Sequence, residues 1–87
     1  MTELELYKFI TENNIEWHPA NNDGVEDIIM FVNLYHMQAF SQILGPNIVD
    51  EDGVYCILKQ GYLCFWMNDI CDYFDIKVDN VFKKITS

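Results

Sequence analysis

Residues 54–66, VYCILKQGYLCFW, decide the fold, because two short apolar runs flank a turn that contains a glycine. The runs Val54–Leu58 and Tyr62–Trp66 are rich in aromatic and aliphatic side chains, which favour strands. Gly61, at the end of the intervening segment, can take the positive φ that a short hairpin loop requires. The stretch therefore predicts an antiparallel hairpin.

A second pair of strands is predicted upstream of this hairpin. Residues Ile15–His18 alternate apolar and polar side chains, which is typical of a half-buried strand. Residues Asp27–Val32 form a nearly continuous apolar run, which indicates a buried strand. The stretch Pro19–Gly24 between them is rich in turn-forming residues and is expected to be a long polar loop.

Helix signals lie between and around the two hairpins. Thr2 and Glu5 have the spacing of a capping box and predict a helix that begins at the N-terminus. Asn33 is a suitable cap for a second helix over residues 34–44, with Leu34 on its inner face and a Gly-Pro pair after its end.

Two further helices are predicted after the second hairpin. Asn68 is expected to cap the first of them, with Asp72 in the position of a capping-box carboxylate. The final helix is expected to carry the apolar residues Val81, Phe82 and Ile85, and two lysines near its C-terminal end, where the helix dipole favours cations.

The predicted fold class is α+β, with the element order α-β-β-α-β-β-α-α. We expect a single domain over residues 1–87, in which a small four-stranded antiparallel or mixed sheet has its helices packed on one face. Apolar residues make up 51% of the chain and aromatic residues 15%, which suffices for a compact core without disulfides or metal.

The chain is strongly acidic, and this limits the partners it can bind. Fourteen Asp and Glu face five Lys, there is no Arg, and the formal net charge is −9. Direct nucleic-acid binding and binding to an anionic membrane are not expected, because both need basic residues. A protein with a basic surface is the natural complement, and the alternative is that the charge only keeps the chain soluble.

No catalytic or metal-binding motif is present. Cys56, Cys64 and Cys71 lack the paired spacing of a zinc site, and no signature joins them to His18 or His36. We therefore predict no enzyme activity, no metal and no cofactor, with the cysteines acting as small core residues. A three-residue hairpin loop would place Cys56 opposite Cys64, and a two-residue loop would shift that register by one.

Acidic residues recur in clusters, and seven of them form the predicted partner-binding surface. A separate acidic group lies at Asp23, Glu26 and Asp27. Helix capping explains part of this pattern, and a surface that mimics the phosphates of nucleic acid is the alternative. The seven residues are Asp50, Glu51, Asp52, Asp69, Asp72, Asp75 and Asp79.

Two resemblances bear on these expectations. Residues 69–82, DICDYFDIKVDNVF, resemble the closing helices of Cro/repressor-type helix-turn-helix domains, but the basic recognition helix is missing, so DNA binding is not implied. In size, charge and aromatic-rich α+β pattern, the whole chain resembles small acidic proteins of phages and mobile elements, including anti-CRISPR and anti-restriction proteins. That resemblance implies a stoichiometric inhibitor that blocks the nucleic-acid channel of a host enzyme such as a nuclease.

The sequence thus predicts a non-enzymatic protein-interaction module whose acidic surface competes with nucleic acid for a basic host protein. The alternative is a homo-oligomeric structural or regulatory domain, such as a homodimer, of a prophage or bacterial cytosolic protein. The chain starts without a signal-peptide pattern and lacks a long apolar run, so we expect it in the cytoplasm of a bacterial host.

Overall fold

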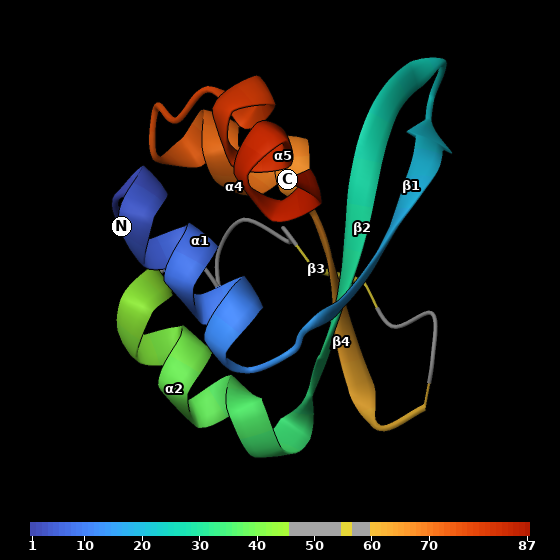
Figure 1. Ribbon diagram of the computed structural model, residues 1–87. Coiled ribbons are helices and arrows are strands. Elements are labelled where there is room, and N and C mark those ends of the chain that lie inside the picture. Colours follow the sequence, from blue (N-terminus) through green and yellow to red (C-terminus); the bar gives the residue numbers. More distant parts are fainter. Residues whose placement is uncertain (46–54, 57–59) are drawn as a thin grey trace.

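The computed structural model describes residues 1–45, 55–56 and 60–87, and it has helices on one side of an antiparallel sheet (Figure 1). The elements, in chain order, are α1 (Glu3–Glu12), β1 (Glu16–Asn22), β2 (Val25–Asn33), α2 (Leu34–Leu44), β3 (Tyr55–Cys56), β4 (Tyr62–Trp66), α4 (Met67–Tyr73) and α5 (Val78–Thr86). The predicted α+β class is confirmed.

The sheet has the strand order β1-β2-β4-β3, and every pairing in it is antiparallel. The central strand β2 pairs with β1 on one side and with β4 on the other. Of the predicted strand Val54–Leu58, only β3 lies among the described residues, so a complete fourth strand stays a prediction. The described pair Cys56 and Cys64 are register partners, as the three-residue loop predicted.

The predicted long loop over Pro19–Gly24 is wrong, because β1 continues through most of it. Only Asp23 and Gly24 connect β1 to β2, and both have positive φ, of 52° and 85°. Positive φ at both central residues is the hallmark of a tight type I′ hairpin turn, for which Asp-Gly is a preferred pair. Pro19 is tolerated in β1 because this strand lies at the edge of the sheet.

The caps of the first two helices are confirmed. The Thr2 hydroxyl accepts a hydrogen bond from the Glu5 amide at 3.2 Å, and the Glu5 carboxylate accepts one from the Thr2 amide at 2.9 Å. The Asn33 side chain accepts one from the His36 amide at 2.8 Å and so caps α2. Leu34, however, is 63% exposed, so its predicted place on the inner face is wrong.

The predicted start of α4 is wrong. The helix begins at Met67, and its N-cap residue Trp66 makes no side-chain capping bond. Asn68 lies in the first turn instead of capping it, and its backbone amide donates to the Asp27 carboxylate of β2 at 3.0 Å. The helix is therefore capped by a residue that lies 41 positions earlier in the chain.

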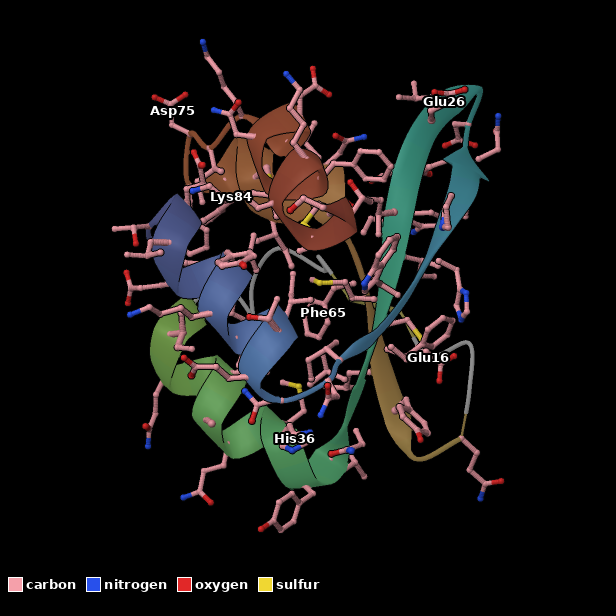
Figure 2. All side chains as sticks on the ribbon, in the orientation of Figure 1. Glu16, Glu26, His36, Phe65, Asp75 and Lys84 are labelled. Carbon is pink, nitrogen blue, oxygen red and sulfur yellow. The ribbon has the colours of Figure 1, made fainter. Side chains whose placement is uncertain are left out.

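The core lies between the helices and one face of the sheet. Residues Ile28, Met30 and Val32 alternate along β2 on this face, and all three are buried. Phe40 of α2 stacks on Phe9 of α1 with 4.3 Å between ring centroids. Phe40 also meets the Phe65 ring edge-on at 5.1 Å, and Figure 2 shows Phe65 between the sheet and the helices.

The last helix packs against the first. The Lys84 ammonium lies 2.9 Å from the Glu3 carboxylate, and this contact lowers the pKa of Glu3 below its usual value. Val81 is fully buried, whereas Phe82 is 39% exposed. Phe82 instead meets the Trp17 ring of β1 edge-on at 6.3 Å, which places α5 beside the first hairpin.

Candidate functional site

Asp27 is the one charged residue among the buried residues of the described chain, with 6% of its surface exposed. Its Oδ1 accepts hydrogen bonds from the Ile28 amide at 2.7 Å and the Asn68 amide at 3.0 Å. Its Oδ2 accepts one from the Asn22 side-chain amide at 3.2 Å. A buried carboxylate is tolerated when such bonds replace its hydration, so Asp27 joins the first hairpin to α4.

Carboxylates of α4 lie close to Asp27. Burial raises the pKa of Asp69, and the negative charges of Asp27 and Asp72 raise it further. Residues three apart on a helix are neighbours on its surface, so Asp69 and Asp72 share a face, as the sequence predicted. The Asn68 side-chain amide also donates to the Glu26 carbonyl at 3.4 Å, which holds the hairpin and the start of α4 together.

A third element adds a further carboxylate. Asp79, in the first turn of α5, lines a groove together with Glu26 and Asp27 of the hairpin. These contacts connect five carboxylate residues, and we call this group of residues the acidic end of the molecule. It consists of Glu26, Asp27, Asp69, Asp72 and Asp79.

The other predicted site residues have different outcomes. Asp75 lies between α4 and α5 and is exposed, and Figure 2 shows it at the same end of the molecule as Glu26. Asp50, Glu51 and Asp52 lie outside the described residues, so their part in the surface stays a prediction. The structure thus brings Asp69, Asp72 and Asp79 together with hairpin carboxylates that the sequence grouped separately.

The acidic end keeps a net negative charge. Lys77, the N-cap residue of α5, is the lysine nearest to Asp79 in sequence, and it is exposed. Lys84 is engaged with Glu3, away from the groove. Lys83 lies four positions after Asp79 on α5 and is therefore also its neighbour. Five carboxylates with two adjacent lysines still leave an excess of acceptors, and acceptors in this arrangement suit the N–H donors of Lys or Arg on another molecule.

The burial of Asp27 and its contacts with two elements were not predicted from the sequence. Its position at the head of an apolar run is the single hint, because a charged residue that begins a buried strand needs hydrogen-bond partners. Those partners come from Asn22 and Asn68, which belong to separate parts of the chain.

The side chains of Cys64, Cys71 and both histidines lie in the described part of the chain. Cys64 and Cys71 are fully buried free thiols, and neither is hydrogen-bonded to His18 or His36. His18 is exposed and lies 3.0 Å from the Glu16 carboxylate. Among the described residues, no three His, Cys, Asp or Glu side chains are placed to hold a metal ion together.

We expect Cys71 to resist thiol reagents in the native protein. Burial, with the charges of Asp72, Asp27 and Glu3, raises the pKa of Cys71 from 9.0 to about 12. The reactive thiolate should then be about a thousandfold rarer at pH 8 than in the unfolded chain. Alkylation with mass-spectrometric mapping checks this, with the urea-unfolded protein as control. Rapid native labelling of Cys71 would contradict the packing of α4.

Comparisons with protein-family models, curated proteins and solved structures find no match to this chain. In the part of the chain that the structure describes, no helix has both the length and the apolar character needed to cross a membrane. The acidic end is therefore the feature of this molecule that bears on its function.

Proposed function

We propose that this chain is a non-enzymatic protein-interaction module that presents its acidic end to a basic, nucleic-acid-binding surface of another protein. The observation that carries the proposal is the convergence of carboxylates from β2, α4 and α5 at one end of the fold. Burial, and after it the negative charges of Asp27 and Asp72, raise the pKa of Asp69; a cationic partner would offset that repulsion, so part of the binding free energy would come from this arrangement.

The sharper form of the proposal is a stoichiometric inhibitor that competes with nucleic acid. Carboxylates held on a folded scaffold present fixed negative charges to a groove that is lined for phosphates. The net charge of −9 adds long-range attraction to such a surface, and salt weakens this attraction.

The test compares two double variants of equal net charge in a pulldown from bacterial lysate with stepped salt elution. Asp72→Asn/Asp79→Asn neutralises two carboxylates of the acidic end, and Glu12→Gln/Glu16→Gln neutralises two exposed carboxylates elsewhere. We expect the unmodified protein and the Glu12/Glu16 variant to retain a nucleic-acid-binding protein that added DNA or RNA displaces. The Asp72/Asp79 variant should lose it at lower salt, with severalfold less retained near physiological ionic strength.

Two outcomes would overturn the proposal. Equal retention by both double variants would show that the acidic end is not the binding surface. Recovery of the protein only with itself would instead favour the homo-oligomeric alternative, for which the exposed Leu34 and Tyr35 at the start of α2 are the apolar candidates.

A further inference from the structure

A groove separates the first hairpin from α5, two elements that lie side by side in Figure 1. Its volume is about 570 Å³, which is within the usual range of about 300–1,000 Å³ for ligand-binding pockets. Ala20 of β1 and Val78 of α5 form its walls, and Asp27 and Ile28 form its buried floor. It is therefore large enough to receive a long side chain and its neighbour in sequence.

The polar part of the groove carries one sign of charge. Asp27 lies on the floor, while Glu26 and Asp79 are exposed and lie on opposite sides of the opening. Among the described residues that line it, none is a lysine or a histidine. Within the described part of the chain, none of these three carboxylates forms an ion pair.

The Asp27 carboxylate can accept a further hydrogen bond. Two oxygens offer about four acceptor positions, and three are used by Ile28, Asn68 and Asn22. Because Oδ2 accepts only the single bond from Asn22, the spare position is on this oxygen. The buried carboxylate is therefore only partly satisfied, and its charge adds to the negative potential around the groove.

The apolar part of the groove is exposed on α5. Phe82 is 39% exposed although it is large and apolar, and its ring is held by the edge-on contact with Trp17. Half-buried Val78 lies one helical turn before it on the same lining. An aromatic face beside carboxylates suits a cation with an aliphatic stem, since the stem packs on the ring and the charge meets the acids.

We propose that this groove receives an arginine side chain from a segment of a partner protein, with an apolar neighbour of that arginine packed on Phe82. The guanidinium is planar and carries five donors, so it can bridge Glu26 and Asp79 at the opening while its stem contacts Phe82. A lysine ammonium is a point charge that holds its water more strongly and bridges such a pair less well. The inference depends on the proposed function and adds to it the residue that is recognised.

The experiment is an NMR titration of the ¹⁵N-labelled full chain with three short capped peptides. Each contains tryptophan followed by arginine, by lysine or by citrulline, which has nearly the shape of arginine without its charge. We expect shifts confined to amides around the groove, such as those of Ala20, Asp79 and Phe82. Affinity for the citrulline peptide should be about tenfold weaker than for the arginine peptide.

Matched variants locate the contacts. Asp79→Asn should reduce the preference for arginine over citrulline, whereas Asp75→Asn, an exposed carboxylate outside the groove lining, should not. Phe82→Ala should weaken the binding of all three peptides by a similar factor, because it removes the apolar contact and leaves the charges of the groove in place. Equal affinity for arginine, lysine and citrulline, or shifts away from the groove, would overturn the inference.

The two proposals fail separately. If the peptides do not bind the groove, and the lysate partner is still lost on neutralising Asp72 and Asp79, the acidic end acts as a charged surface and the groove does not recognise arginine. If the arginine peptide binds and both double variants retain the lysate partner equally, the groove binds arginine and the proposed competition with nucleic acid is wrong.

Discussion

Replacing Phe40 by alanine should destabilise the protein by about 3–5 kcal/mol. The side chain is fully buried, and it connects α1 to the sheet through its stacked contact with Phe9 and its edge-on contact with Phe65. Alanine would remove both contacts and leave a cavity that the surrounding helices can fill only in part. Domains of this size have a total stability of about 5–15 kcal/mol, so the variant is expected to be close to unfolding.

Urea and thermal unfolding followed by circular dichroism would measure this loss. A decrease of this size should lower Tm by at least about 12 °C in a domain of under 100 residues. Tyr35→Ala is the matched control, because Tyr35 belongs to the same helix and is 88% exposed. Its effect should stay within about 0.5 kcal/mol. A Phe40→Ala protein that unfolds at nearly the original urea concentration would contradict the described core.

A double-mutant cycle separates the ring contact from simple burial. Phe9→Leu and Phe40→Leu keep most of the apolar volume and remove the stacked pair. We expect a coupling free energy of about 0.5–1.5 kcal/mol between the two positions.

The features that the sequence predicted correctly depend on residues close together in the chain. The capping box of Thr2 and Glu5 and the Asn33 cap each involve residues three positions apart. Of the two registers that the sequence left open for the second hairpin, the observed pairing of Cys56 with Cys64 is the one that a three-residue loop ending at Gly61 gives, and the φ of Gly61 is 85°. Such signals can be read without knowledge of the tertiary structure.

The first hairpin was predicted with the wrong turn because composition and local geometry conflict there. Pro19, Asn21 and Asn22 are typical loop residues, yet they lie in a strand that pairs with only one neighbour. An edge strand tolerates such residues, since only one side of its backbone must be hydrogen-bonded. The Asp23-Gly24 pair was the better signal, because its backbone preference fits a two-residue hairpin turn.

The candidate site was predicted in part. Asp69 and Asp72 share a face because both lie on α4, and helical spacing suffices to show this. The packing of the hairpin, α4 and α5 brings Glu26, Asp27 and Asp79 to the same end of the molecule. No local sequence pattern encodes that packing. The groove beside Phe82 has the same origin, because its walls come from β1 and α5 at opposite ends of the sequence.

The second large effect is expected at Asp27, where alanine should cost about 3 kcal/mol of stability. Asp27→Ala leaves the amides of Ile28 and Asn68 without the Oδ1 acceptor, and Ile28 is buried, so water cannot easily replace the lost bond. Loss of a helix cap alone costs about 0.5–2 kcal/mol. Glu26→Ala, which removes an exposed carboxylate from the adjacent position, should change stability by less than about 0.5 kcal/mol.

Asp27→Asn separates the hydrogen bonds from the charge. Asparagine keeps an oxygen that can accept from Ile28 and Asn68, and it replaces only the Oδ2 acceptor of the Asn22 bond, so this variant should lose only about 1 kcal/mol. Removing the charge should also lower the pKa of Asp69, since Asp27 is one of the groups that raise it. NMR titration of the Asp69 carboxyl group measures that pKa, and urea unfolding measures the stability.

Asp72→Asn provides the comparison that distinguishes the two roles of Asp27. It should also lower the pKa of Asp69, but it leaves the bonds to α4 in place and should therefore leave stability nearly unchanged. Because the pKa of Asp69 is raised in the folded state, its ionisation lowers the stability of the fold as pH rises through that pKa. Both asparagine variants should therefore show a smaller loss of stability over this pH range. If Asp27→Ala were no less stable than Asp72→Asn, the carboxylate would contribute only charge, and the link between the hairpin and α4 would have to come from apolar packing.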